Sequence, residues 1–189
     1  MRIIAGRAKG RRLIAPPGLH TRPTASRVRE ALFSVIMPRL AGAKVLDAFA
    51  GSGALGLEAL SRGAKTATFI EEDAAALKVL RRNVENCRLI GAKIIPGDAL
   101  RFLRQAGEPY DIIFLDPPYR SAILAQALTA LLESNTLATD ALITAEIAAT
   151  EEFHPPPGLN IIKHSHYGQT ALYYLQKQQP TNQTLSSKL

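Results

Sequence analysis

The fold is decided by one stretch of the chain, Val45-Leu46-Asp47-Ala48-Phe49-Ala50-Gly51-Ser52-Gly53-Ala54-Leu55-Gly56. A short apolar run leads into three glycines with the spacing G-x-G-x-x-G. Such glycines let the chain turn sharply from a strand into a helix and let a ligand approach the backbone closely. Glu71 follows Gly51 by twenty residues, at the end of the next apolar run, where it can accept hydrogen bonds from ribose hydroxyls. A plain tight turn is the alternative, but the combination indicates a nucleoside-bearing cofactor.

Strand-like and helical patterns alternate from this stretch towards the end of the chain. The strand-like runs are residues 45–49, 66–70, 93–95, 111–115 and 141–145, and a helical pattern follows each of the first four. Such alternation implies a parallel sheet with helices on both faces. Two further runs, 159–163 and 171–175, have only a short link between them and predict an antiparallel hairpin. We therefore predict an α/β fold with a doubly wound, mostly parallel sheet and an antiparallel terminal hairpin.

The first forty residues differ from the rest in charge. They carry nine Lys and Arg side chains against one acid, Glu30, whereas the remaining chain has fourteen basic and fifteen acidic residues. Apolar runs at 2–5 and 11–15 predict a small hairpin. The apolar spacing from Val28 to Ile36 predicts a helix that begins at Thr24 or Ser26 and ends at Pro38. The N-terminus is therefore predicted to be a basic hairpin and helix.

The chain is long enough for one domain with a full core and small extensions, since 47% of its 189 residues are hydrophobic. We expect a basic extension at 1–40, an α/β domain at 41–177 and a polar, disordered tail at 178–189. No apolar run is long enough to cross a bilayer, and the N-terminus lacks a signal-peptide pattern. We expect a cytoplasmic monomer with no membrane contact and no obligate protein partner.

The charge of the site distinguishes between cofactors that share this loop geometry. An acid before the glycines, Asp47, would repel a pyrophosphate but suits a ligand with an ammonium and a sulfonium, which favours S-adenosylmethionine (SAM). Asp98 follows the third strand, where it can accept a hydrogen bond from an adenine amine. It can also act as the N-cap of the next helix. The predicted cofactor-binding residues are Asp47, Phe49, Gly51, Gly53, Glu71, Asp98 and Ala99.

The fourth strand ends in Asp116-Pro117-Pro118-Tyr119, the most specific pattern in the chain. Two prolines fix the backbone and remove two amide donors, so the turn presents carbonyl oxygens as acceptors beside the aspartate. Two acceptors that hold the hydrogens of an exocyclic base amine can orient its weakly nucleophilic nitrogen, and an aromatic ring can stack on the base. A rigid turn with a capping aspartate is the alternative. We predict that Asp116, Pro117 and Tyr119 act on the substrate.

These motifs together resemble those of class I amino-methyltransferases that act on nucleic acids. More closely, the stretch from Arg2 to about Leu175 resembles the RsmD family, which methylates N2 of a guanine in small-subunit (16S) ribosomal RNA. The carrying residues are Arg2-Ile3-Ile4-Ala5-Gly6, Thr21-Arg22-Pro23-Thr24, Arg27-Val28-Arg29-Glu30-Ala31-Leu32-Phe33, the stretch from Leu46 to Ala59 and the Asp-Pro-Pro-Tyr turn. The resemblance implies a Rossmann-like, SAM-dependent methyltransferase fold. It also implies ribosomal RNA, or an assembly intermediate of the small ribosomal subunit, as the partner.

The basic N-terminal residues are the predicted contacts for that RNA. A segment with this charge excess can follow a phosphate backbone, although a solvated basic face would look the same in the sequence. The predicted RNA-binding residues are Arg7, Lys9, Arg11, Arg12, Arg22, Arg27 and Arg29.

Other functions have weaker support. A single cysteine, Cys87, excludes an internal disulfide and a multi-thiolate zinc site, and the pair His164 and His166 lacks a third ligand, so we expect no metal. A DNA adenine-N6 or protein glutamine methyltransferase would use a similar Asp-Pro-Pro-Tyr turn. A nicotinamide oxidoreductase conflicts with the acid before the glycines. A non-catalytic RNA-binding assembly factor would not need the cofactor motifs.

Overall fold

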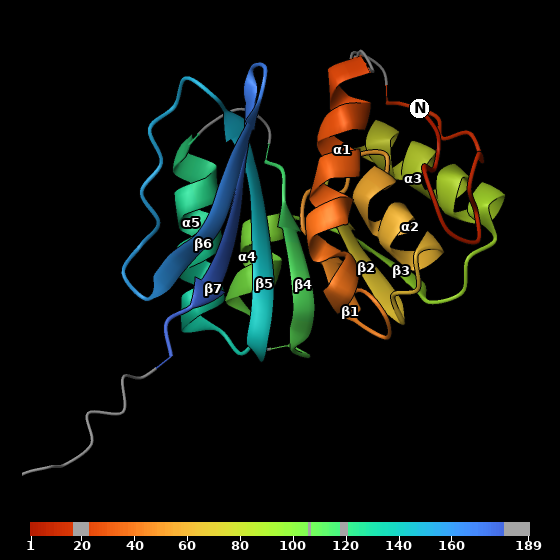
Figure 1. Cartoon of the computed structure of the whole chain (residues 1–189). Coiled ribbons are helices and arrows are strands. Elements are labelled where there is room, and N and C mark those ends of the chain that lie inside the picture. Colours follow the sequence, from red (N-terminus) through yellow and green to blue (C-terminus); the bar gives the residue numbers. More distant parts are fainter. Residues whose placement is uncertain (17–22, 106, 118–120, 180–189) are drawn as a thin grey trace, which may run out of the picture.

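The computed structural model describes residues 1–16, 23–105, 107–117 and 121–179 (Figure 1). The helices are α1 (Pro23–Ile36), α2 (Ala54–Ser61), α3 (Ala74–Cys87), α4 (Ala99–Arg104) and α5 (Ser121–Glu133), with a 3-10 turn, η1 (Met37–Arg39), after α1. The strands are β1 (Lys44–Asp47), β2 (Thr66–Glu71), β3 (Ala92–Pro96), β4 (Tyr110–Leu115), β5 (Leu137–Ala148), β6 (Leu159–Tyr167) and β7 (Thr170–Lys177). Within the described ranges, no helix is long and apolar enough to span a bilayer.

The strands form one seven-stranded sheet with the order β3-β2-β1-β4-β5-β7-β6. The first five strands pair in parallel, and β7 pairs antiparallel with both β5 and β6. The predicted doubly wound sheet with a reversed terminal hairpin is therefore confirmed. The strand order reverses between β1 and β4, which is the place where such sheets form a ligand crevice at their carboxyl ends.

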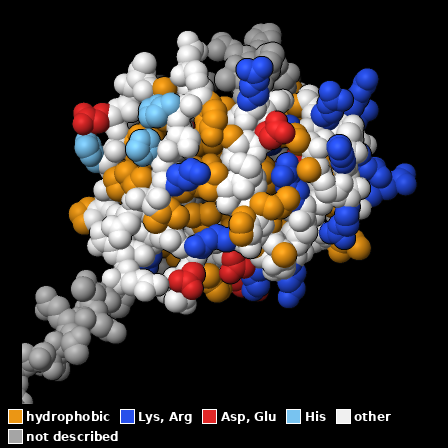
Figure 2. Space-filling model, in the orientation of Figure 1, with side chains coloured by type: hydrophobic (Ala, Val, Ile, Leu, Met, Phe, Trp, Pro, Cys, Tyr) orange, Lys and Arg blue, Asp and Glu red, His pale blue; other side chains and the backbone are white. Residues whose placement is uncertain are grey.

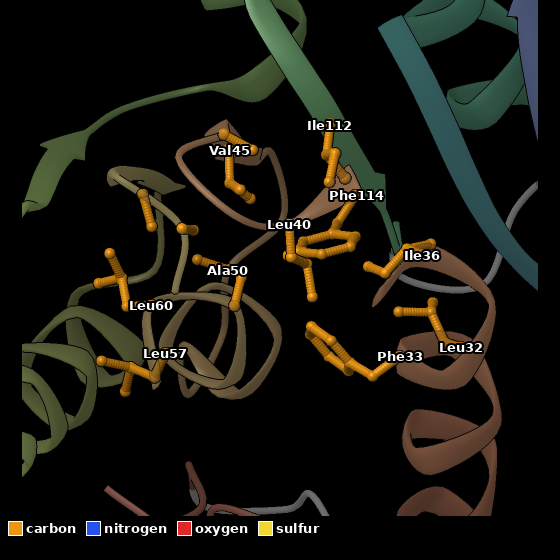
Figure 3. Close-up of a cluster of buried hydrophobic side chains, with 14 of the residues drawn as sticks. Leu32, Phe33, Ile36, Leu40, Val45, Ala50, Leu57, Leu60, Ile112 and Phe114 are labelled. Carbon is orange, nitrogen blue, oxygen red and sulfur yellow. The ribbon is translucent and has the colours of Figure 1, made fainter. Parts of the chain in front are cut away.

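Helices cover both faces of the sheet and define two hydrophobic cores. Side chains of α1, α2 and α3 pack on one face, and those of α4 and α5 pack on the other. In the first core, Phe33 of α1 meets Phe114 of β4 edge to face, with ring centroids 5.8 Å apart (Figure 3). Arg62 lies over the same Phe33 ring at 4.9 Å. The helix predicted from Thr24 or Ser26 is thus present, and it begins at Pro23 because proline fits the first turn of a helix.

The N-terminal segment, residues 1–16, shares the first core and is not a separate arm. Ile3, Ala8 and Leu13 are buried together with residues of α1, α2 and β2. The predicted hairpin is present but short: it has one antiparallel bridge, between Arg2 and Arg12, and backbone hydrogen bonds join Ile3 and Leu13 to the opposite arm. A longer ladder is absent from this segment because several of its amides donate to side chains of α2 and α3 instead.

Glu58 of α2 is the main acceptor for those amides. Its carboxylate is fully buried and accepts hydrogen bonds from the N–H groups of Ile4 and Ala5 at 2.8 and 2.9 Å. It also pairs with Arg62 at 2.7 Å and lies 4.0 Å from Arg29. Two backbone donors and two guanidinium groups therefore depend on one side chain.

The predicted tail at 178–189 lies outside the described residues from position 180 onward, and so does Arg22. The boundary proposed at residue 40 falls inside a continuous core, since Leu32 and Phe33 pack with Leu57, Phe69 and Phe114. The segment 1–40 is accordingly part of the same packed body as the sheet.

We predict that Glu58→Ala lowers the free energy of unfolding by about 3 to 5 kcal/mol, because it leaves buried N–H groups and a buried guanidinium without their acceptor. Urea denaturation followed by circular dichroism measures the change. Glu85→Ala, on the exposed face of α3, is the control and should change stability by less than about 0.5 kcal/mol. Equal stabilities of the two variants would contradict the anchoring role.

Candidate active site

The glycine loop between β1 and α2 has the geometry that its sequence requires. Gly51 and Gly53 have φ angles of 52° and 77°, a region that side-chain-bearing residues rarely adopt. A Cβ atom on Gly56 would lie 2.3 Å from the Phe69 ring, so this glycine lets α2 pack closely on β2. A Cβ on Gly51 would meet nothing within 4 Å. The loop therefore has open space on the side where a ligand would approach.

Two carboxylates hold this loop from strand ends. Glu71 at the end of β2 accepts the Gly51 N–H at 2.7 Å with one oxygen and the Asp73 N–H at 2.8 Å with the other. Asp47 at the end of β1 accepts the Gly56 N–H of α2 at 3.0 Å. A carboxylate oxygen has two lone pairs, so half-buried Glu71 keeps acceptor capacity for a ribose hydroxyl.

Asp47 lies beneath the loop. It is 2% exposed, so a ligand can hardly touch it. Asp47 would therefore act on the cofactor by charge and not by direct contact. Burial raises the pKa of its carboxyl to about 7, and the nearby carboxyls of Asp116 and Glu71 add to the rise. A cation above the loop would offset this accumulation of acids.

The remaining predicted cofactor residues lie along the same edge. Asp98 caps α4, since its Oδ1 accepts the Arg101 N–H at 2.6 Å, and the residue is exposed. The alternative capping role is thus present, and one carboxylate oxygen remains for a ligand. Phe49 is half-buried and Ala99 is buried, both at the second core.

The Asp116–Pro117 turn follows directly after β4. Parallel pairing of β4 with β1 places Asp47 beside Phe114, so this turn begins one strand away from the glycine loop. The Asp116 residue has an exposed surface. Desolvation by the neighbouring parts of the chain nevertheless raises the pKa of its carboxyl to about 6. Tyr119, the predicted stacking residue, lies outside the described residues.

One acid at this edge was missed by the sequence analysis. Glu146 near the end of β5 is hydrogen-bonded to Thr170 of β7, and burial together with Asp116 raises the pKa of its carboxyl to about 8. The available signal was position, because an acid at the carboxyl end of a fifth parallel strand lies at the same edge as Asp116.

The basic side chains gather on the side of the molecule formed by the N-terminal segment, α2 and α3 (Figure 2). Arg7, Lys9 and Arg12 of the N-terminal segment are exposed, and so is Arg27 of α1. Arg11 is also exposed, and its guanidinium donates to the Asn86 carbonyl.

Two basic residues depart from the prediction. Arg29 is 7% exposed and donates to the Arg2 carbonyl at 2.7 Å, so it does not fit the predicted phosphate contact and serves the packing of α1. Arg88 at the end of α3 was not predicted, yet it lines a recess together with Arg11 and Arg12.

The comparisons with known proteins agree with this architecture. Residues 1–176 match the family model described as "Conserved hypothetical protein 95". The chain is 44% identical over 146 residues to "Ribosomal RNA small subunit methyltransferase D" of Escherichia coli (strain K12), covering 77% of this chain and 74% of that protein. The same-named protein of Haemophilus influenzae is 40% identical over 167 residues, covering 86% of each chain. The chain belongs to the RsmD family.

Solved structures extend the likeness to the three-dimensional fold of this RsmD-family chain. "Putative methyltransferase yhhF from Escherichia coli" has a TM-score of 0.85 at 40% identity, covering 94% of this chain and 97% of that one. A putative methylase from Haemophilus influenzae has a TM-score of 0.80 at 35% identity, covering 94% and 98%. The resemblance to the family and the Rossmann-like methyltransferase fold are both confirmed.

We predict that SAM binding to this RsmD-family protein releases protons near neutral pH. The raised pKa of Asp47, about 7, means that its carboxyl is partly protonated there, and a cationic ligand favours the ionised form. Affinity should therefore rise with pH between roughly 6 and 8 and then level off. Isothermal titration in buffers of different ionisation enthalpy measures the protons released. Asp47→Asn keeps an acceptor for the Gly56 N–H and should bind more weakly with fewer protons released; unchanged release would contradict the role of Asp47.

Proposed function

We propose that this protein transfers the methyl group of SAM to the exocyclic N2 of a guanine in small-subunit ribosomal RNA. The observation that carries the proposal is the Asp116–Pro117 turn at the carboxyl end of β4, beside the glycine loop, in a chain 44% identical to the Escherichia coli "Ribosomal RNA small subunit methyltransferase D". Family membership supports methyl transfer to ribosomal RNA. The guanine N2 target follows from the family that the sequence resembles.

The edge of the sheet fits SAM in charge and in space. The acids Glu71, Asp98 and Asp116 at this edge, with Asp47 beneath the loop, suit a ligand that carries an ammonium and a sulfonium, and they would repel a pyrophosphate. We assign ribose hydroxyls to Glu71 and the adenine amine to Asp98. The open backbone at Gly51 gives the ligand its close approach, with Gly53, Phe49 and Ala99 along the same edge. Bound SAM supplies a methyl group that its sulfonium already activates, so the protein contributes mainly alignment.

Asp116 and Pro117 align the acceptor. The Asp116 carboxylate and the Pro117 carbonyl oxygen can accept the two N–H bonds of the amine, which directs the nitrogen lone pair toward the methyl group. The Asp116 carboxylate would also be placed to take the proton that the nitrogen loses when it is methylated, with water as the alternative acceptor. Tyr119 would stack on the extruded base.

The exposed basic residues of the N-terminal segment, with Arg27 and Arg88, are the proposed contacts to the RNA backbone. The proposed partner is ribosomal RNA or an assembly intermediate of the small subunit, met in the cytoplasm by a monomeric enzyme. Mass spectrometry of small-subunit ribosomal RNA from cells with and without the gene tests the proposal. Loss of one N2-methylguanine is expected, and an unchanged modification pattern would contradict it.

We predict that Asp116→Ala lowers methyl transfer at saturating SAM by at least about a hundredfold, because the amine loses one of two orienting acceptors. SAM affinity should change little, since the partner of Asp116 is the target amine. Single-turnover assays on small subunits and a separate cofactor titration measure the two effects. Asp111→Ala, at the other end of β4, is the control. A near-normal single-turnover rate in Asp116→Ala would contradict the assignment.

We predict that replacing Arg7, Lys9, Arg11 and Arg12 with alanine lowers RNA affinity and flattens its dependence on salt. The logarithmic slope should decrease by roughly 0.7 to 0.9 for each phosphate that the variant no longer neutralises. Filter binding at several salt concentrations gives the slope, and circular dichroism verifies folding. A control variant replaces four exposed basic residues elsewhere, Lys65, Arg104, Lys163 and Lys177. Equal slopes in the two variants would indicate that the segment only aids solubility.

A further inference from the structure

Glu146 and Asp116 lie close together at the carboxyl ends of two neighbouring strands. Leu115 of β4 pairs with Ala145 of β5. Asp116 follows Leu115, and Glu146 follows Ala145. Phe114 and Leu142, two and four residues earlier, belong to the core on the α1 face. Side chains alternate along a strand, so Glu146 points to that same face. Asp116 follows the last residue of β4 and lies near enough to raise the pKa of the Glu146 carboxyl. Glu146 therefore lies next to Asp116, the residue proposed to align the substrate amine.

The surroundings of Glu146 hold it in place without neutralising it. On β7, the Thr170 side chain is hydrogen-bonded to its carboxyl, and Leu172 is its cross-strand neighbour. Asp116 faces it from β4 as a like charge. Among the described residues, neither acid has an ion-pair partner. Two neighbouring carboxyls with no cation raise each other's pKa, and carboxyl pairs of this kind are typical of sites that bind a ligand.

We propose that Glu146 is a substrate-contacting residue that selects guanine, by accepting the N1–H of the target base while Asp116 and Pro117 hold the adjacent N2 amine. This rests on the proposed function. Guanine presents N1–H and N2–H as neighbouring donors, and two acceptors on neighbouring strands match that edge. Adenine and 2-aminopurine lack both the N1–H and the O6 oxygen, so they cannot form the paired contacts that the Glu146 carboxyl can make with guanine.

The protonation of the pair is compatible with this role. Burial and Asp116 raise the pKa of Glu146 to about 8, so near neutral pH the pair of carboxyls holds about one proton, mainly on Glu146. A protonated Glu146 still accepts the N1–H with its carbonyl oxygen and can donate its proton to O6 of guanine. The proton that N2 loses on methylation would go to the ionised Asp116 and from there to water, because Glu146 already holds the proton of the pair.

The test compares target bases. Small subunits are reconstituted with ribosomal RNA that carries either guanine or 2-aminopurine at the modified position, placed there by ligation of a synthetic segment. Transfer to each is measured as kcat/KM for wild-type protein, Glu146→Ala and Glu146→Gln. Wild type should prefer guanine, and Glu146→Ala should reduce that preference by roughly ten- to a hundredfold. Glu146→Gln, whose amide can accept from N1–H and donate to O6, should keep most of it.

Asp140→Asn is the matched control, because it removes a carboxylate from the same strand at its opposite end, about 20 Å away. SAM titration and thermal melting verify that each variant folds. If Glu146→Ala slows both substrates equally and keeps the wild-type preference, Glu146 is structural and the inference is overturned. If wild-type protein leaves the guanine unmethylated, the proposed function fails and the inference fails with it, which is a different observation.

Discussion

The structure depends on two hydrogen bonds that fix the glycine loop between strand ends. Glu71 accepts the Gly51 N–H at its start, and Asp47 accepts the Gly56 N–H within the first turn of α2. The Asp47 bond is buried, so losing it would leave an uncompensated polar group in the core. The Phe69 ring beneath Gly56 leaves no room for the helix to shift inward. The loop therefore has little freedom to adapt and offers a cofactor a preformed surface.

The rigidity of α2 extends to the N-terminal segment through Glu58. That buried carboxylate binds backbone amides of the segment, while Ser61 accepts the Ala8 N–H at 2.9 Å and donates to the Ala5 carbonyl at 2.6 Å. Asn83 of α3 fixes the other end of the segment by pairing with both backbone groups of Ile14. The basic surface and the glycine loop consequently belong to one packed body. An RNA held by the former would meet the latter at a fixed distance.

Features encoded in consecutive residues could be predicted from the sequence. Predictions were less accurate where a residue's role depends on partners far away in the sequence. The glycine spacing and the Asp-Pro-Pro turn identified the loop and the carboxyl end of β4, because turn chemistry is encoded in consecutive residues. The basic count correctly indicated an exposed surface but included Arg29, whose burial depends on Arg2 and Glu58 across the core. The hairpin was predicted correctly, but the sequence could not show that other amides of the same segment donate to side chains of α2 and α3. Glu146 was missed because only the register with β4 reveals its neighbour.

The opposite charges of the two surfaces constrain how a nucleic acid can reach the site. Asp47, Glu71, Asp116 and Glu146 bring carboxyl groups to the carboxyl ends of adjacent strands, where they offer acceptors and a phosphate would be repelled by those that are ionised. The exposed arginines and lysine of the N-terminal segment attract that same phosphate backbone. A base carries no net charge, and the edge of guanine that bears N1–H and N2–H is rich in donors. The base is therefore favoured at the acidic edge of the sheet while the backbone stays on the basic surface, which is the arrangement that extrusion of a single nucleotide produces.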